Sequence, residues 1–271
     1  MVGKVVIIGA GPGPADLLTV RAVEKLRAAE VVLHDDLVSV QVLALCAPSA
    51  QIVNVGKRCG KRGAAQERIN ALMIHFARKG LAVARLKSGD PAVFGRLGEE
   101  LKALREAEVP FEIVPGITAV AAAAAAAEMT LTDRRIASAL VVLTAHNAGD
   151  QPKPRAIPEV DRTTFAIYMP GPDYSRTARA LMEQGIDSAT PCAVVSNAGR
   201  SNQQVRHLLL RDLGSTQGIV APAVLIVGRV AERFEVPSGA RDPYRLNGSG
   251  PRVQIPPDIA SALRSCPWIE S

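Results

Sequence analysis

Short apolar runs alternate with amphipathic stretches along the first 115 residues of the chain. A short apolar run predicts a strand, and apolar positions three and four residues apart predict a helix. The strands predicted in this way cover residues 4–8, 31–33, 52–55, 83–86 and 111–114, and the helices cover residues 20–29, 65–78 and 98–107. Thr19 is well placed to cap the first helix. Alternation of strand and helix is typical of an α/β fold with a mostly parallel sheet.

The pattern changes after Pro115, where we place a domain boundary. A run of alanines predicts a closely packed helix over residues 118–128, because alanine has the highest helix propensity. Further strands are predicted at residues 140–143, 164–168, 192–195 and 224–227, and helices at residues 175–184 and shortly after residue 208. Longer turns separate these strands, which favours a mixed sheet.

This interpretation divides the chain into three regions. Residues 1–115 form an N-terminal α/β domain, residues 116–236 form a C-terminal α/β domain, and residues 237–271 form a tail. The tail is rich in Gly, Pro and Ser, so we expect it to be poorly ordered or extended over the surface. The segment 149–158 contains three prolines and predicts a loop.

Composition excludes several classes of protein. With 48% hydrophobic and 21% charged residues, the balance is that of an ordinary soluble protein, and no apolar stretch reaches the ~18 residues of a membrane span. The four cysteines and four histidines are scattered, which predicts no metal site and favours a reducing cytoplasm. The net charge of +6 favours an anionic partner. Aromatic residues make up only 3%, which argues against nucleic acid, because single strands are bound by stacking bases on aromatic rings.

A turn rich in glycine and proline follows the first strand, at Gly9 to Pro14. A dinucleotide-binding fold would carry Gly-x-Gly-x-x-Gly there, but both possible frames lack the third glycine. Pro12 and Pro14 have no N–H to offer a phosphate, and Asp16 would repel one. A nicotinamide cofactor is therefore disfavoured, although Asp35 could imitate a ribose-binding acid. The turn suits close approach to a ligand without phosphate, or a purely structural role.

An ordered set of short motifs runs from Val2 to Arg233. The motifs lie at residues 6–13, 17–19, 34–39, 55–60, 66–70, 85–91, 94–100, 114–119, 131–134, 144–146, 168–169 and 222–228. Each is weak alone, but together they resemble the uroporphyrinogen-III C-methyltransferase family within the tetrapyrrole methylases. The resemblance implies a two-domain class III methyltransferase fold, a homodimer, and S-adenosyl-L-methionine in the cleft between the domains, with S-adenosyl-L-homocysteine as its product. It implies two successive methyl transfers to ring carbons of uroporphyrinogen III, giving precorrin-2 for sirohaem or cobalamin-type biosynthesis.

The resemblance also assigns candidate roles to single residues. Asp35 matches the proposed proton acceptor and Lys57 the proposed proton donor. The positions that match cofactor contacts are Pro12, Ser88, Gly89, Asp90, Val93, Thr118, Ala119, Met169 and Ala198. Arg96 and Arg134 are candidates for binding the carboxylates of the tetrapyrrole substrate, or for structural ion pairs.

The residues themselves leave two of these roles open. Asp35 follows a strand, where parallel sheets present functional groups, but a carboxylate there also caps the next segment in many proteins. Lys57 belongs to a basic cluster with Arg58, Lys61 and Arg62. That cluster suits a substrate rich in carboxylates, because cations pair with carboxylates, or it is simply solvated.

Several positions depart from the family pattern. Ala92 stands where the family has a large aromatic residue, and Asp133 stands where it has a histidine. Both changes fall on the acceptor side, so a methylase of a later precorrin, or of another acceptor, is an alternative. A dinucleotide-binding oxidoreductase or a nucleotide sensor is the alternative from another class.

Overall fold

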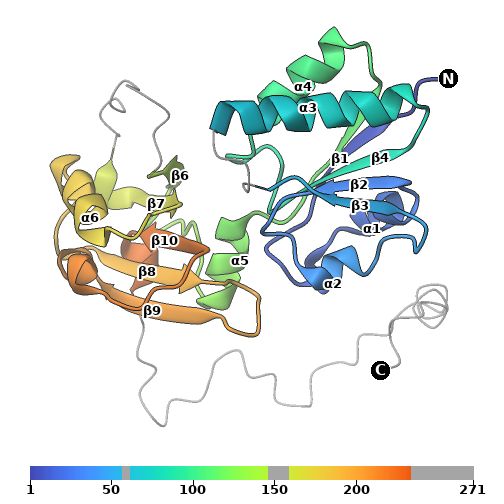
Figure 1. Ribbon diagram of the computed structural model, residues 1–271. Coiled ribbons are helices and arrows are strands. Elements are labelled where there is room, and N and C mark those ends of the chain that lie inside the picture. Colours follow the sequence, from blue (N-terminus) through green and yellow to red (C-terminus); the bar gives the residue numbers. More distant parts are fainter. Residues whose placement is uncertain (57–61, 146–158, 233–271) are drawn as a thin grey trace, which may run out of the picture. The chain divides into compact units, whose positions relative to one another are not determined.

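The computed structural model describes residues 1–56, 62–145 and 159–232 (Figure 1). These residues belong to one unit, Met1–Glu232, and form two sheets of five strands each. The first sheet falls within the predicted N-terminal domain, and the second within the predicted C-terminal domain. The predicted loop 149–158 and the predicted tail 237–271 lie outside the described residues.

The first sheet is fully parallel, with the strand order β3-β2-β4-β1-β5. Its strands are β1 (Val5–Gly9), β2 (Val31–His34), β3 (Gln51–Asn54), β4 (Val83–Lys87) and β5 (Phe111–Val114). They confirm the prediction from the apolar runs. The inner strands β1, β2 and β4 are almost entirely buried, whereas the edge strands β3 and β5 are partly exposed. The carboxyl ends of parallel strands lie along one edge, where ligands of open α/β sheets usually bind.

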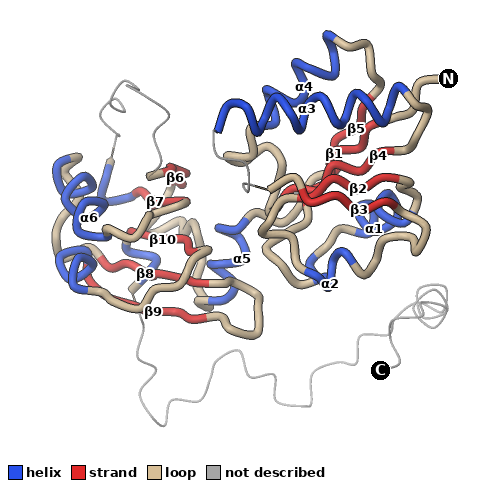
Figure 2. Tube along the Cα trace, viewed as in Figure 1, coloured by secondary structure: helices blue, strands red, loops and turns tan. Residues whose placement is uncertain are grey.

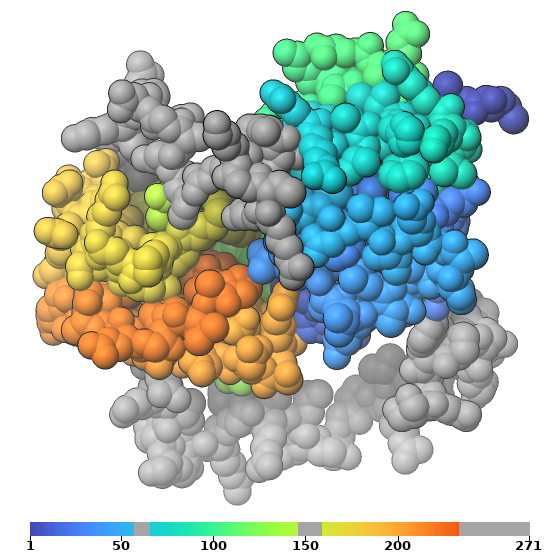
Figure 3. All heavy atoms as spheres, in the orientation of Figure 1, coloured from blue at the N-terminus to red at the C-terminus, as the bar shows by residue number. Residues whose placement is uncertain are grey.

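Helices cover both faces of this sheet (Figure 2). One layer contains α1 (Val20–Arg27) and α2 (Val40–Leu43), and the other contains α3 (Arg62–Arg78) and α4 (Leu97–Glu106). Leu26 of α1 packs in one core cluster with Ile8, whereas Met73 of α3 and Leu104 of α4 pack in the other with Ile7. The cyan and green side chains of α3 and α4 form a continuous layer in the space-filling view (Figure 3).

Side-chain caps begin both helices of the first layer. The Thr19 hydroxyl accepts a hydrogen bond from the Ala22 N–H at 3.1 Å, which confirms the predicted cap of α1. The Ser39 hydroxyl does the same for the Val42 N–H at 3.2 Å. We did not predict α2, because its single turn is too short to show a helical period. The 3-10 helix η1 (Ala15–Leu17) lies between the glycine turn and α1.

The second sheet is mixed, as the sequence predicted, and has the strand order β6-β7-β10-β8-β9. Its strands are β6 (Ala139–Thr144), β7 (Thr163–Tyr168), β8 (Pro191–Ser196), β9 (Gln204–Leu209) and β10 (Ala223–Val227). The pair β6 and β7 is parallel, and the other neighbours are antiparallel. The 3-10 helix η2 (Val160–Arg162) directly precedes β7, and η4 (Arg229–Ala231) follows β10.

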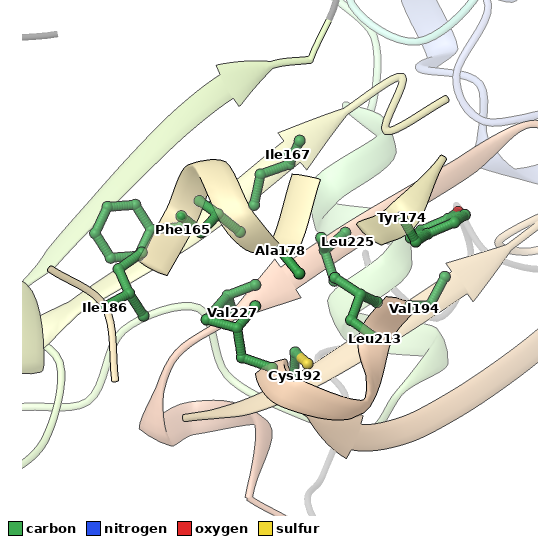
Figure 4. Packing of buried hydrophobic residues seen from close by; sticks show 12 residues of the cluster. Phe165, Ile167, Tyr174, Ala178, Ile186, Cys192, Val194, Leu213, Leu225 and Val227 are labelled. Carbon is green, nitrogen blue, oxygen red and sulfur yellow. The ribbon is translucent and has the colours of Figure 1, made fainter. Parts of the chain in front are cut away.

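Each face of the second sheet also has an apolar cover. On one face α6 (Tyr174–Glu183) and the 3-10 helix η3 (Leu210–Ser215) pack with the strands; Phe165, Ala178, Leu213 and Leu225 belong to this cluster (Figure 4). On the other face lies α5 (Ala119–Ala126), the predicted alanine helix, whose Ala123 is fully buried.

Two segments differ from the prediction. β9 was not predicted, because it is an edge strand with polar residues such as Gln204, Arg206 and His207 and therefore lacks an apolar run. The helix predicted after residue 208 is the 3-10 helix η3.

Candidate active site

Three glycines bring the carboxyl ends of β1, β4 and β5 into close backbone contact. Gly9 ends β1, Gly89 follows β4 and Gly116 follows β5. A Cβ atom at Gly9 would lie 2.5 Å from the Gly116 nitrogen and 2.8 Å from the Gly89 carbonyl oxygen. A Cβ atom at Gly116 would collide with the same carbonyl oxygen. The three strand ends are therefore packed backbone against backbone, and we call Gly9, Gly89 and Gly116 together the glycine floor.

The glycine turn after β1 is tied to the turn after β4. The Gly89 N–H donates to the Gly11 carbonyl at 2.7 Å, and the Gly11 N–H donates back at 3.2 Å. Both residues have positive φ, +64° and +69°, a region that glycine enters without a steric penalty. Pro12, which is buried, and Ser88 therefore lie in two turns that are held side by side.

Asp90 holds the second turn against the end of β5. One carboxylate oxygen accepts from the Gly116 N–H at 3.0 Å, and the other accepts from the Ala92 N–H at 2.8 Å. The Val93 N–H donates to the Asp90 carbonyl at 3.2 Å. A carboxylate has about four acceptor positions, so both oxygens can still accept another donor. Asp90 thus shapes the turn, in addition to the cofactor contact that the family resemblance implies.

The N-terminus of α5 lies beside this turn. Thr118 caps the helix by accepting from the Ala121 N–H at 3.3 Å, and the Ala119 nitrogen would lie 3.9 Å from a Cβ atom at Gly89. The Tyr168 hydroxyl accepts from the Val120 N–H at 3.0 Å. Burial raises the pKa of Tyr168, so the phenol stays neutral at physiological pH. The structure therefore places Thr118 and Ala119 next to the glycine floor.

The remaining candidates for the cofactor site also follow strands. Ala198 comes after β8 and packs in the same apolar cluster as Ala119 and Tyr168. Met169 comes directly after β7, has a φ of +50° and is 43% exposed. Tyr168 and Phe94, whose ring centroids lie 5.2 Å apart, were not among the predicted site residues. A signal was present for both, because each lies in one of the family motifs, at residues 168–169 and 94–100.

Asp35 stands at the carboxyl end of β2, and an arginine holds its carboxylate. Arg85 Nη2 lies 2.6 Å from Asp35 Oδ1. The Arg85 side chain is 2% exposed, whereas that of Asp35 is 33% exposed. Among the described residues no backbone N–H donates to this carboxylate, so the structure gives Asp35 a side-chain partner and not the capping role that was the alternative.

Arg85 belongs to a buried set of charges beneath α3 and α4. Its Nε lies 3.0 Å from Glu100 Oε1, and Lys87 Nζ lies 2.9 Å from the same oxygen. Burial alone would lower the pKa of Arg85, but the charges of Asp35 and Glu100 outweigh it and raise that pKa. Burial, and then repulsion from Arg85, lower the pKa of Lys87.

The remaining candidates are Lys57, Arg96 and Arg134. Lys57 is outside the described residues, so its predicted role stays a prediction. Arg96 makes a two-point ion pair with Glu99, at 2.7 and 2.6 Å, and the pair is exposed. Arg134 is exposed and has no acidic partner in the part of the chain that the structure describes.

Two further structural findings concern the described residues as a whole. No group of three or more His, Cys, Asp or Glu side chains among them is arranged to hold a metal ion. None of their helices combines the length and the apolar character needed to cross a membrane.

The sequence identifies the class of protein to which the two sheets belong. The sequence matches the tetrapyrrole (corrin/porphyrin) methylases over residues 4–214, and the chain therefore belongs to that family. It is 40% identical to the uroporphyrinogen-III C-methyltransferase of Paracoccus denitrificans over 253 residues, which cover 90% of this chain and 86% of that protein. It is 42% identical to siroheme synthase 1 of Cronobacter sakazakii over 232 residues, 85% of this chain. The chain spans about half the length of such synthases, 49% in this case.

A solved structure agrees with this assignment. Uroporphyrin-III C-methyltransferase of Thermus thermophilus, complexed with S-adenosyl homocysteine, has a TM-score of 0.72 to this chain and is 36% identical. The match covers 84% of this chain and 98% of that one. The predicted α/β methylase fold is therefore confirmed.

Proposed function

We propose that this protein transfers methyl groups from S-adenosyl-L-methionine to two ring carbons of uroporphyrinogen III, which gives precorrin-2. The observation that carries the proposal is the 40% identity to a uroporphyrinogen-III C-methyltransferase across 86% of that protein. The match favours uroporphyrinogen III over a later precorrin as the acceptor. Family membership likewise favours a methylase over a dinucleotide-binding oxidoreductase.

The glycine floor fits S-adenosyl-L-methionine. A Cβ atom at Gly89 would have the Ala119 nitrogen as its nearest neighbour, at 3.9 Å, so a ligand can approach the backbone closely there, whereas Gly9 and Gly116 pack against each other. Pro12, Ser88 and the α5 start at Thr118 border this turn. The resemblance adds Asp90, Val93, Ala119, Met169 and Ala198 to the cofactor contacts. When bound, the cofactor supplies a methyl group on a positively charged sulfur and leaves as S-adenosyl-L-homocysteine. We place it between the two sheets, because its candidate contacts come from strand ends of both.

Methylation of a ring carbon leaves the tetrapyrrole with a proton to lose. Asp35 accepts that proton, because a third of its side chain is open to solvent, whereas both oxygens of Asp90 accept from backbone N–H groups. Lys57 is proposed as the proton donor on the strength of the family resemblance. Arg96 and Arg134, both exposed, would pair with substrate carboxylates. We also propose, from the resemblance, a homodimer that works in the cytoplasm and feeds sirohaem or cobalamin-type biosynthesis.

The test is incubation with uroporphyrinogen III and methyl-labelled S-adenosyl-L-methionine under reducing conditions, followed by mass spectrometry of the tetrapyrrole. We expect a product with two labelled methyl groups. A tetrapyrrole without label would refute the proposal. Calorimetry with S-adenosyl-L-homocysteine and with a nicotinamide dinucleotide distinguishes a methylase from a dinucleotide-binding protein. We expect S-adenosyl-L-homocysteine to bind and the dinucleotide not to bind.

A further inference from the structure

Glu100 is a fully buried carboxylate in a helix position that the pattern would assign to an apolar residue. It lies on the same face of α4 as Leu97, Leu101 and Leu104, which pack in the core cluster below α3 and α4. Its side chain is 0% exposed. A buried charge is costly unless it is paired. A carboxylate at this position therefore needs partners in the sheet beneath it.

Those partners come from one face of β4. Residues two apart along a strand point to the same face, so Val83, Arg85 and Lys87 all point toward α3 and α4. Glu100 Oε1 accepts from Arg85 Nε at 3.0 Å and from Lys87 Nζ at 2.9 Å. The buried Gln66 of α3 adds a third donor at 3.3 Å. Among the described residues, the second oxygen, Oε2, is buried without a hydrogen-bond partner.

Arg85 connects the buried carboxylate of Glu100 to the partly exposed carboxylate of Asp35. Its Nε donates to Glu100, and its Nη2 donates to Asp35 Oδ1. Its Nη1 donates to the carbonyls of Leu33, at 3.4 Å, and Leu86, at 3.1 Å. A planar guanidinium with partners on all three nitrogens cannot rotate without breaking several of these bonds. Its orientation is therefore fixed by β2, β4 and α4 together.

We propose that Glu100 and Arg85 are positioning residues for Asp35. Glu100 fixes the plane of the Arg85 guanidinium, and Arg85 holds Asp35 Oδ1 so that Oδ2 faces the tetrapyrrole. This inference rests on the proposed function, because it assumes that Asp35 is the base. Lys87 has a different role, because it balances the charge. With Lys87 the set Asp35, Arg85, Lys87 and Glu100 contains two cations and two anions and is neutral, which lowers the free-energy cost of burying Glu100 and Arg85.

The main test variant is Arg85→Lys, which keeps the charge but cannot form the fork between Asp35 and Glu100. We expect kcat for methylation of uroporphyrinogen III to fall on the order of 10- to 100-fold, because small misplacements of catalytic groups have effects of that size. KM and the affinity for S-adenosyl-L-homocysteine should stay within about twofold, since neither of those sites is altered. Glu106→Gln, an exposed glutamate on the same helix, is the control and should leave all three unchanged.

Glu100→Gln should lower kcat in the same way, although it leaves an unbalanced buried charge and could unfold. Glu100→Gln with Lys87→Met restores neutrality, so its stability should approach that of the wild type while kcat stays low. If Glu100 acts through Arg85, adding Glu100→Gln to Arg85→Lys should lower kcat no further than the larger single effect. Losses that multiply would contradict the inference.

The outcomes separate this inference from the function it rests on. A wild-type chain that does not methylate uroporphyrinogen III overturns both. An active wild type with Arg85→Lys at full kcat overturns only the positioning role. Equal loss of kcat and of S-adenosyl-L-homocysteine affinity in Arg85→Lys would mean a general collapse of packing, and would also overturn it.

Discussion

At the scale of single residues, the two aspartates of the site differ in their hydrogen-bond partners and in their exposure to solvent. Both oxygens of Asp90 accept from backbone N–H groups. The carboxylate of Asp35 instead meets a side chain and keeps a third of its surface exposed. The two aspartates both follow strands of the parallel sheet, so sequence position alone does not distinguish them. Their hydrogen-bond partners do, and they predict different effects of substitution.

Asp35→Asn should lower kcat by at least 100-fold, since a carboxamide does not accept the ring proton, an effect in the range of general-base catalysis. The affinity for S-adenosyl-L-homocysteine, measured by calorimetry, should stay within about twofold, because Asp35 follows β2 and is not part of the glycine floor. Asp161→Asn, an exposed aspartate beside the second sheet, is the matched control. Equal losses of turnover and affinity would instead give Asp35 a structural role.

Asp90→Ala should act mainly on cofactor binding. It removes the acceptor for the Gly116 and Ala92 N–H groups, so the turn after β4 loosens. An unpaired backbone donor costs about 1–3 kcal/mol, so we expect roughly a tenfold or greater loss of S-adenosyl-L-homocysteine affinity. Asp90→Asn, which keeps one acceptor oxygen, should lose less. If the wild type, Asp90→Ala and Asp90→Asn bound S-adenosyl-L-homocysteine equally well, Asp90 would not belong to the cofactor site.

At the scale of elements, the glycine floor depends on three strand ends that touch. Ala substitution at Gly116 forces a Cβ atom into the Gly89 carbonyl and the Gly9 backbone. Backbone cannot move aside as a side chain does, so we expect a loss of about 1–3 kcal/mol in the free energy of unfolding and a loss of S-adenosyl-L-homocysteine binding. Urea titration and calorimetry measure the two effects.

Gly98 offers the control for that substitution. It lies in the first turn of α4, and a Cβ atom there would meet nothing within 4 Å. Gly98→Ala should therefore be neutral or stabilising by up to about 1 kcal/mol, because alanine favours the helix. Should Gly116→Ala prove as harmless as Gly98→Ala, close contact of the strand ends would not be what forms the site.

Elements also show what a sequence can predict. β1 and β2 of the first sheet were predictable because both of their faces are buried, which leaves an uninterrupted apolar run such as Val5 to Ile8. β9 was not predictable, because the polar residues Gln204, Arg206 and His207 leave it without an apolar run. The partners of Glu100 were also beyond prediction. Beside Glu99 it looks like any surface glutamate, and only the packing of α4 on β4 brings it to Arg85.

At the scale of the whole molecule, residues far apart in the chain must hold the turns of the site together. Arg200, in the loop after β8, reaches the glycine turn after β1. Its Nε donates to the Pro12 carbonyl at 3.2 Å, and its Nη2 donates to the Leu37 carbonyl at 2.8 Å. Leu37 lies two residues after Asp35. One side chain from the second half of the chain thus touches both the candidate cofactor turn and the segment that carries the candidate base.

Arg200→Ala should therefore weaken both functions of the site together. We expect a several-fold loss of S-adenosyl-L-homocysteine affinity and a parallel fall in kcat, because two carbonyls lose their donor and the turns are free to move. The loss of stability should be about 1.5–3 kcal/mol, the usual contribution of a hydrogen bond to a charged group. Arg179→Ala, at an exposed position on α6, removes the same charge and should change none of the three. If the Arg200 variant lost stability alone, with affinity and kcat unchanged, the contact would join the two halves of the chain without arranging the site.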